Sequence, residues 1–303
     1  MTNYLILDYT VREKIWGSDY FLNHKMTDKK SPAGELWSCS GHKESLSYIT
    51  KGEFKGQSLD YLYKNNRELF GTKEEDFPLL IKLISASQNL SVQVHPDNLY
   101  AREKENEFGK TEGWLILGEK SSNIILGHNA KNRNDLEKYI NNNDFTNLLR
   151  KFDVNKGEFY KVYPGTIHAI CGSNLILEIQ QSSNVTYRFY DYDRVTNGKK
   201  RELHLKKALE VTRFEESLID KKNYFLEKEE SVVLWDNDYF SVELVNVFDE
   251  YEIKALDKFL IVTVLDDFLL ENNLLTFASS FIVTKNSSVN IKGSGRIVIS
   301  RPK

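Results

Sequence analysis

The 303-residue sequence has little of several residue types, and each shortage excludes a class of protein. Its two cysteines, Cys39 and Cys171, are too few for a disulfide framework and fit a reducing cytoplasm. No apolar run approaches the roughly 20 residues of a membrane-spanning helix, and the start, Met1 to Asp8, lacks the basic region and cleavage site of a secretion signal. The 41 basic residues are balanced by 44 acidic ones, which gives no electrostatic footprint for nucleic acid. We therefore expect a cytoplasmic protein that binds neither membranes nor nucleic acid.

Aromatic residues are plentiful, with 16 tyrosines and 17 phenylalanines against five prolines and two methionines. Because aromatic and β-branched residues favour strands, the composition predicts a mainly β protein. Short strand-like segments at regular spacing after about residue 230 predict a separate all-β unit, so we divide the chain into residues 1–230 and 231–303. Helical insertions are expected in the first part, at about 57–70, 97–107, 131–152 and 205–218. Residues 15–17 and 31–34 have the composition of turns.

Gln93 and His95 close a strictly alternating segment, Leu90 to His95. Side chains two residues apart on a strand point to the same face, so an amide oxygen and an imidazole there can reach one point in space. Taken alone, these two residues favour the simpler interpretation, a half-buried strand whose polar face meets solvent.

His168 follows a sharp turn. Pro164-Gly165 presets the turn, and His168 lies three residues beyond the glycine, an arrangement close to the second motif of cupin barrels, in which the histidine points inward. Glu112 opens a strand-like segment and, beside His95 and His168, offers a carboxylate. Two imidazoles, a carboxylate and an amide suit zinc with an open position, while two histidines and one carboxylate also suit non-haem Fe(II).

Three cationic residues are candidates for the chemistry. Arg188 lies in an aromatic strand-like segment, where it could bind a phosphate or a developing enediolate, or simply pair with Asp191 or Asp193. Lys82 interrupts an apolar run, so burial is expected to depress its pKa and make it a possible base; the alternative is a lysine that extends to solvent at a strand edge. Lys110 shares the face of Glu112 on an extended strand.

Taken together and in order, these pieces resemble the class I mannose-6-phosphate isomerases of the cupin superfamily, in their short bacterial form. The resemblance covers roughly residues 5–215. The matching stretches are Gly34 to Trp37 with Ser40 to His42, Pro78 to Lys82, Leu90 to Asp97, Gly109 to Glu112, Pro164 to Ala169, and Gln180 to Arg194. The sequence departs from the family pattern at Ser38-Cys39 and at Lys43.

The resemblance implies a fold of two cupin-like (jelly-roll) β-barrels. It implies that one Zn²⁺ per chain is bound by four ligands, Gln93, His95, Glu112 and His168. It also implies that Arg188 is the active-site arginine and that Lys82 and Lys110 line a sugar-phosphate pocket. The implied reaction interconverts mannose 6-phosphate and fructose 6-phosphate through a cis-enediol, and the sequence does not identify the group that takes the proton.

Two other functions remain open at this point. One is an Fe(II)-dependent cupin dioxygenase that uses His95, Glu112 and His168, and the other is a non-catalytic cupin that binds sugar phosphates. The expected partner is a small hexose 6-phosphate, and the chain is expected to be a monomer or a weak homo-oligomer.

Overall fold

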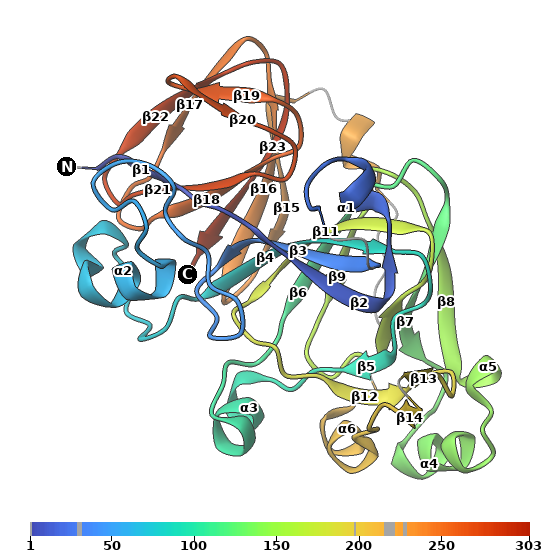
Figure 1. Ribbon diagram of the computed structural model, residues 1–303. Coiled ribbons are helices and arrows are strands. Elements are labelled where there is room, and N and C mark those ends of the chain that lie inside the picture. Colours follow the sequence, from blue (N-terminus) through green and yellow to red (C-terminus); the bar gives the residue numbers. More distant parts are fainter. Residues whose placement is uncertain (1, 29–31, 197, 215–221, 227–228) are drawn as a thin grey trace.

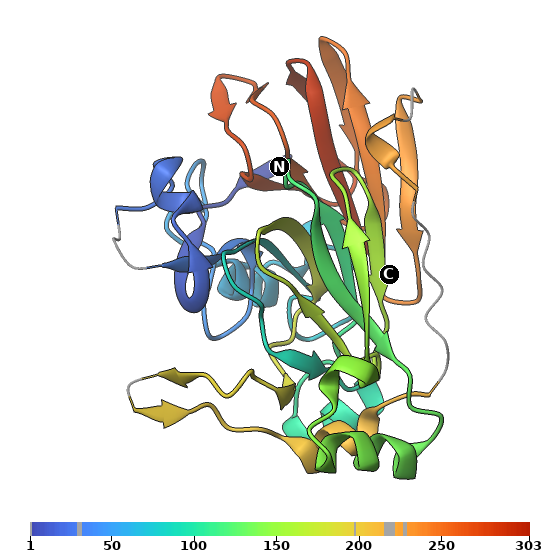
Figure 2. The same ribbon diagram turned by 90° about the vertical axis from the view of Figure 1, so that its right-hand side faces the viewer.

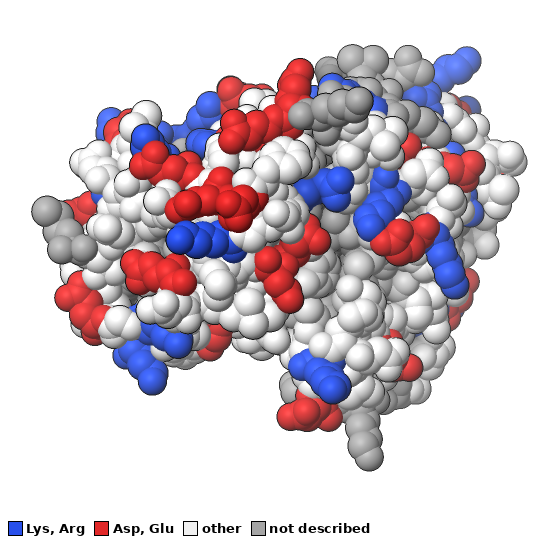
Figure 3. Space-filling model, turned by 90° about the horizontal axis from the view of Figure 1, so that it is seen from above, with Lys and Arg blue, Asp and Glu red and all other residues white. Residues whose placement is uncertain are grey.

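The computed structural model describes residues 2–28, 32–196, 198–214, 222–226 and 229–303 (Figure 1). Its regular structure is mostly antiparallel β, as predicted. Among the described residues no helix is long and apolar enough to cross a membrane. Acidic and basic side chains are interspersed on the face shown in Figure 3.

The strands of the N-terminal part form two large sheets. One contains, in spatial order, β2 (Thr10–Ser18), β3 (Ala33–Ser40), β4 (Leu79–Ala86), β11 (Asn174–Gln181), β6 (Glu112–Ile116) and β9 (Phe159–Val162). The other contains β12 (Tyr187–Tyr190), β5 (Val92–Val94), β10 (His168–Ile170), β7 (Ser122–His128) and β8 (Leu149–Val154). Apolar side chains from both sheets, including Ile84, Trp114, Leu126 and Ile170, pack into one core between them. The sheets thus face each other without merging into one closed barrel.

A second pair of sheets is built from the C-terminal strands, at the top of Figure 1. One contains β1 (Tyr4–Ile6), β21 (Ser280–Val283), β18 (Leu260–Val264), β23 (Gly295–Pro302), β16 (Phe240–Val247) and β15 (Ser231–Asp236). The other contains β17 (Glu250–Lys254), β22 (Ser288–Lys292), β19 (Phe268–Leu270) and β20 (Asn273–Leu275). Strand β1 therefore joins the chain's first residues to a sheet of its last residues. The division at residue 230 stays a prediction.

Strand β4 is buried on both faces, which explains the apolar run that contains Lys82. Leu79, Ile81 and Leu83 point to a core that they share with C-terminal residues such as Phe240. Because successive side chains alternate, Lys82 points with Ile84 to the opposite face, between the two N-terminal sheets. A charged group is thereby held inside the protein by a strand whose other face buries Leu79, Ile81 and Leu83.

Helices occur at all four predicted insertions, but two of the predicted segments extend beyond the helices that are present. They are α2 (Leu59–Asn65) with a 3₁₀ turn (Arg67–Leu69), α3 (Asn98–Glu105), α4 (Arg133–Asn141) with α5 (Phe145–Leu148), and α6 (Leu205–Val211). The prediction of helix up to residue 152 is wrong, because residues 149–152 belong to β8, which pairs with β7. There Phe152 packs against the inter-sheet core, so tertiary pairing decides the structure. Helix α6 ends at Val211, so the prediction is also wrong for residues 212–214, and residues 215–218 of the fourth insertion lie outside the described residues.

Smaller elements complete the described chain: α1 (Tyr20–Asn23), a 3₁₀ turn (Tyr224–Leu226), and the hairpin of β13 (Val195–Thr196) and β14 (Lys199–Lys200), which extends from the body in Figure 2. The turns predicted at residues 15–17 and 31–34 are wrong for most of these residues, because β2 runs through 15–17 and β3 begins at Ala33. The glycines there permit close strand contact, since a Cβ on Gly17 would lie 2.5 Å from the backbone of Ala33.

Candidate metal centre

A row of cross-strand neighbours places three predicted residues side by side. Gln93 on β5 is paired with His168 on β10 and with Arg188 on β12. Directly paired residues have side chains on the same face of the sheet. The pairing register therefore brings together residues that lie up to 95 positions apart in the sequence.

The opposing sheet carries a second row. Lys82 on β4 is paired with Trp37 on β3 and with Glu178 on β11, and Glu178 is paired in turn with Trp114 on β6. All four side chains are buried. This row holds an ammonium and a carboxylate between two indole rings.

The predicted histidine and carboxylate ligands converge between the sheets. His95 Nε2 lies 3.2 Å from Glu112 Oε1 and 3.2 Å from His168 Nε2, and His168 Nε2 lies 3.6 Å from Glu112 Oε2. Metal–ligand bonds of about 2.0–2.1 Å in a tetrahedron place neighbouring ligand atoms about 3.3 Å apart, so the spacing fits a single zinc-sized ion. Gln93 Nε2 is 3.5 Å from His168 Nε2, which puts the amide at the edge of the same group.

Burial and hydrogen bonding leave these groups in the state that binds metal. His168 Nδ1 lies 2.8 Å from the carbonyl oxygen of Thr166, so Nδ1–H donates to it and Nε2 faces Glu112 as a lone pair. Burial, with Lys110 nearby, lowers the pKa of His95 to about 3, and burial also lowers the pKa of His168. Burial acts to raise the pKa of Glu112, but Lys110 and the imidazoles outweigh it and hold that pKa well below its usual value. The result is two neutral imidazoles facing a carboxylate.

The Pro164-Gly165 turn positions His168 as the sequence predicts. Gly165 has φ +83°, and its N–H donates to the carbonyl oxygen of His95 at 2.8 Å. A side chain is disfavoured there, because a Cβ would lie 2.7 Å from the carbonyl oxygen of Val211. One glycine thus ties the turn to the segment that carries the other histidine.

Lys110 and Lys82 both point toward the interior, but they have different neighbours. Lys110 Nζ lies 2.7 Å from Glu112 Oε1 and 3.2 Å from His95 Nε2. Lys82 Nζ lies 3.2 Å from Glu178 Oε2 and 5.0 Å from the centroid of the Trp37 ring. Both ammonium groups are therefore close to the metal-binding group or to the wall that faces it.

The expectation that Lys82 has a depressed pKa is wrong. Burial does lower it, but Glu178, Glu35 and Glu112 outweigh burial and raise the pKa of Lys82 above its usual value. The sequence could not show this, because these carboxylates come from other strands. Lys82 is a buried cation and supplies positive charge to the site.

Glu178 and Glu35 are site residues that the sequence reasoning did not single out. Glu178 accepts a hydrogen bond from Trp114 Nε1 at 3.1 Å, and burial raises its pKa, with Glu112 as the next cause. Glu35 accepts from Trp37 Nε1 at 2.8 Å; although burial acts to raise its pKa, Lys82 and Lys14 lower it to about 2. A signal for Glu178 was present in the sequence: it interrupts the apolar run Leu175 to Ile179, just as Lys82 interrupts its own apolar run.

A cavity of about 260 Å³ opens onto this site. Its lining includes Gln93, Lys110, Lys82, Glu178 and Arg188, which together represent both rows. In the described part of the chain Arg188 forms no ion pair with Asp191 or Asp193, the alternative considered from sequence: its Nη1 donates to the carbonyl oxygen of Glu202 at 2.8 Å. The cavity is polar and has both signs of charge in its wall.

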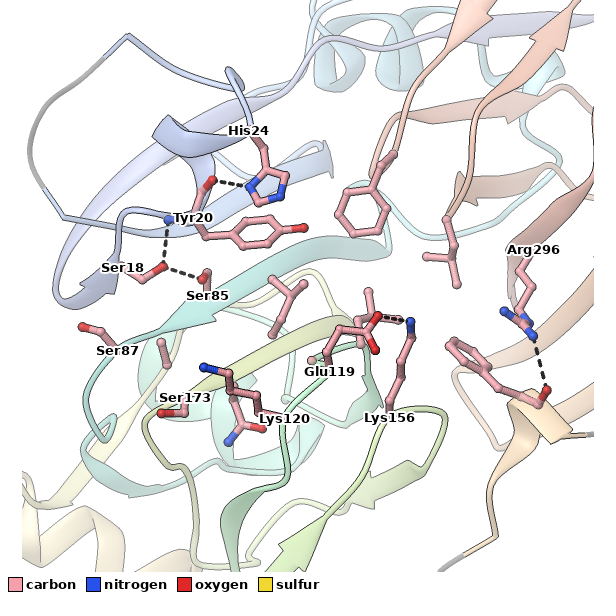
Figure 4. Close-up of a pocket in the computed structure, with 18 of the residues that line it drawn as sticks. Ser18, Tyr20, His24, Ser85, Ser87, Glu119, Lys120, Lys156, Ser173 and Arg296 are labelled. Carbon is pink, nitrogen blue, oxygen red and sulfur yellow. Dashed lines mark hydrogen bonds and ion pairs between the residues drawn. The ribbon is translucent and has the colours of Figure 1, made fainter.

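A larger cavity, of about 610 Å³, lies elsewhere and contains none of the predicted site residues (Figure 4). It is lined by serines and by residues of both halves of the chain, among them Ser18, Tyr20, Lys120 and Arg296. Its Ser18 and Ser85 hydroxyls are hydrogen-bonded to each other at 2.6 Å. Among the described residues, the group of three potential metal ligands is His95, Glu112 and His168, outside this cavity.

The paired β-sheets and the buried His–Glu–His group between them define a cupin-like protein with a candidate metal site. Comparison with known proteins specifies the family. The family profile described as phosphomannose isomerase type I, catalytic domain, matches residues 5–112. Mannose-6-phosphate isomerase ManA of Bacillus subtilis is 40% identical over 262 residues, covering 84% of this chain and 83% of ManA. The B. subtilis protein GmuF, named a probable mannose-6-phosphate isomerase, is 37% identical over the full length of both chains.

Solved structures agree with these relatives. The crystal structure of a mannose 6-phosphate isomerase from B. subtilis has a TM-score of 0.90 and 35% identity and covers 99% of this chain and 100% of its own. A zinc-bound mannose 6-phosphate isomerase has the same fold, with a TM-score of 0.74, 17% identity and full coverage of both chains. The chain belongs to the type I phosphomannose isomerase family. The mainly β, cupin-like fold and the family resemblance read from the sequence are thereby confirmed.

Proposed function

We propose that this protein is a zinc-dependent aldose–ketose isomerase that interconverts mannose 6-phosphate and fructose 6-phosphate. The observation that carries the proposal is the buried His95–Glu112–His168 group beside a cavity lined by Lys82, Lys110 and Arg188. Membership of the family and the names of the relatives favour an isomerase over the iron dioxygenase and the non-catalytic cupin.

The proposed zinc ligands are Gln93, His95, Glu112 and His168, with one ion per chain. The donor atoms of the last three fit a single ion by their spacing, and Oε2 of the buried Glu112 carboxylate lacks a hydrogen-bond partner. Zinc at this position would act as a Lewis acid toward sugar oxygens and help to orient the substrate.

In the proposed reaction the C2 proton of mannose 6-phosphate is removed and a proton is returned to C1, while a hydroxyl proton moves from O2 to O1, through a cis-enediol. Lys82 and Lys110 supply positive charge opposite the oxygens on which negative charge develops. Glu178, whose pKa is raised, has the character of a group that takes and returns a proton. Arg188 binds the anionic substrate.

We further propose that the protein acts in the cytoplasm, where its two buried, unpaired cysteines would stay reduced. The oligomeric state proposed from the sequence, a monomer or a weak homo-oligomer, is retained.

The decisive experiment is a coupled assay that follows the conversion of mannose 6-phosphate to fructose 6-phosphate by the zinc-loaded protein, with and without a chelator. We expect turnover that a chelator abolishes and added Zn²⁺ restores. His168→Ala should lose bound zinc and activity together. The control is His24→Ala, which removes an exposed histidine at the end of α1 and should lose neither. Absence of turnover in the zinc-loaded wild-type protein would refute the proposed activity.

A further inference from the structure

Two guanidinium groups line the same cavity next to the metal-binding group. Arg188 comes from β12, and Arg201 comes from the segment directly after the β13–β14 hairpin. Arg201 was not among the residues singled out from the sequence. The cavity therefore contains a second arginine for which the proposed reaction has given no role.

Arg201 is held by a buried carboxylate. Its Nε donates to Asp191 Oδ2 at 2.7 Å and its Nη2 donates to Asp191 Oδ1, a two-point contact that fixes the plane of the guanidinium. Asp191 is only 4% exposed and also pairs with Arg194, which in turn donates to the carbonyl oxygen of Asn89. Nη1 of Arg201 has no hydrogen bond to the part of the chain that the structure describes, so it is the nitrogen available to a ligand.

Arg188 also has unused donor capacity. Its Nη1 is occupied by the carbonyl oxygen of Glu202, but its Nε is buried without a hydrogen-bond partner. Burial lowers the pKa of Arg188, and the next cause is the positive charge of Arg201. Two like charges in one cavity repel each other, and a bound anion would relieve this cost.

The surrounding charges favour an anion here. Arg188, Arg194 and Arg201 are close to Asp191, with the exposed Glu202 as a second carboxylate. The cavity wall itself contains five cationic residues against two carboxylates: Lys14, Lys82, Lys110, Arg188 and Arg201 against Glu35 and Glu178. Ser91 and Thr186 add hydroxyl groups to the wall of the same cavity, and hydroxyl groups can donate hydrogen bonds to an oxyanion.

We propose that Arg201 and Arg188 together form the subsite for the phosphate group of the substrate, with Asp191 as the residue that positions Arg201. The proposal rests on the proposed isomerase function. The cavity also includes Gln93 and Lys110, so a sugar phosphate bound by the two arginines would have its other end toward the metal-binding group.

The test compares Arg201→Gln and Arg201→Lys with the wild type in the zinc-loaded state, using mannose 6-phosphate as substrate and inorganic phosphate as a competitive inhibitor. A charge-assisted hydrogen bond of ordinary strength corresponds to roughly a 10- to 100-fold effect. We expect Arg201→Gln to raise KM for the substrate and Ki for phosphate by that factor, with kcat changed much less. Arg201→Lys can keep an ion pair with Asp191 but loses the two-point geometry, so it should show an intermediate effect.

The control is Lys200→Gln, one residue away on β14, which removes an exposed charge paired with the exposed Asp193. It should change neither constant more than about twofold, since surface ion pairs contribute little. Unchanged KM and Ki in both Arg201 variants, or an equal change in Lys200→Gln, would overturn the proposal. If the wild type itself lacks isomerase activity, the proposed function fails. Calorimetric binding of inorganic phosphate to wild type and Arg201→Gln then tests the subsite separately, and equal affinities would refute it.

Discussion

Replacement of Lys82 by methionine should destabilise the protein strongly, because it would leave Glu178 buried without its cation. The Lys82 and Glu178 side chains are 3% and 5% exposed, and Nζ and Oε2 are 3.2 Å apart. At an effective dielectric constant of about 20, the attraction at this distance is about 5 kcal/mol. Much of this is offset by the cost of burying both charges, but loss of one partner leaves that cost uncompensated. We expect Lys82→Met to lower the free energy of unfolding by about 3–5 kcal/mol.

Equilibrium unfolding in urea, followed by tryptophan fluorescence, would measure the loss, since Trp37 and Trp114 flank the pair. The double variant Lys82→Met/Glu178→Gln removes both charges and keeps an acceptor for Trp114, so it should recover most of the stability. The control is Lys64→Met, which removes solvent-accessible ion pairs with Asp60 at 2.8 Å and with Asp76 at 2.9 Å and should cost at most about 1 kcal/mol. Equal losses in Lys82→Met and Lys64→Met, or no recovery in the double variant, would refute the reasoning.

Two further predictions concern the histidines and the turn. His95 has a pKa of about 3 in the folded protein, lowered first by burial, against about 6.5 when unfolded. The unfolded chain therefore binds an extra proton between these values, so the free energy of unfolding of the metal-free protein should fall as the pH falls, by up to about 1.4 kcal/mol per pH unit from this residue. Urea unfolding of the metal-free protein at pH 7 and pH 5 would measure this, and the free energy of unfolding should change less with pH in His95→Gln than in the wild type. The same pH dependence in both proteins would contradict a depressed pKa for His95. Gly165→Ala should cost about 1–3 kcal/mol and weaken zinc binding, because φ is +83° and the new Cβ would meet the carbonyl oxygen of Val211. Gly52→Ala, at φ +79° with open space around it, isolates the cost of the backbone conformation, and thermal unfolding that shows equal losses would mean that the contact is unimportant.

Much of the candidate site could be predicted from local pattern. The Pro164-Gly165 turn predicts an inward-facing His168, and the alternation from Leu90 to His95 predicts that Gln93 and His95 share one face. The structure brings both histidines within 3.6 Å of the Glu112 carboxylate. Such patterns succeed because a strand's two-residue period and a turn's backbone angles are local properties. They fail where a distant segment decides, as in residues 149–152, which pair with β7 instead of continuing a helix.

The mainly β character, the approximate positions of the helical insertions, the family resemblance and the residues that could bind a metal can all be read from the sequence. That Lys82 is a cation, that Glu178 and Glu35 belong to the site, and that Arg201 shares a cavity with Arg188 emerges from the folded protein alone. So does the pairing of Tyr4–Ile6 with Ser280–Val283. The physical reason is the same in each case. A pKa, an ion pair or a strand pairing depends on which groups are brought within a few ångströms, and that depends on the packing of segments far apart in the chain.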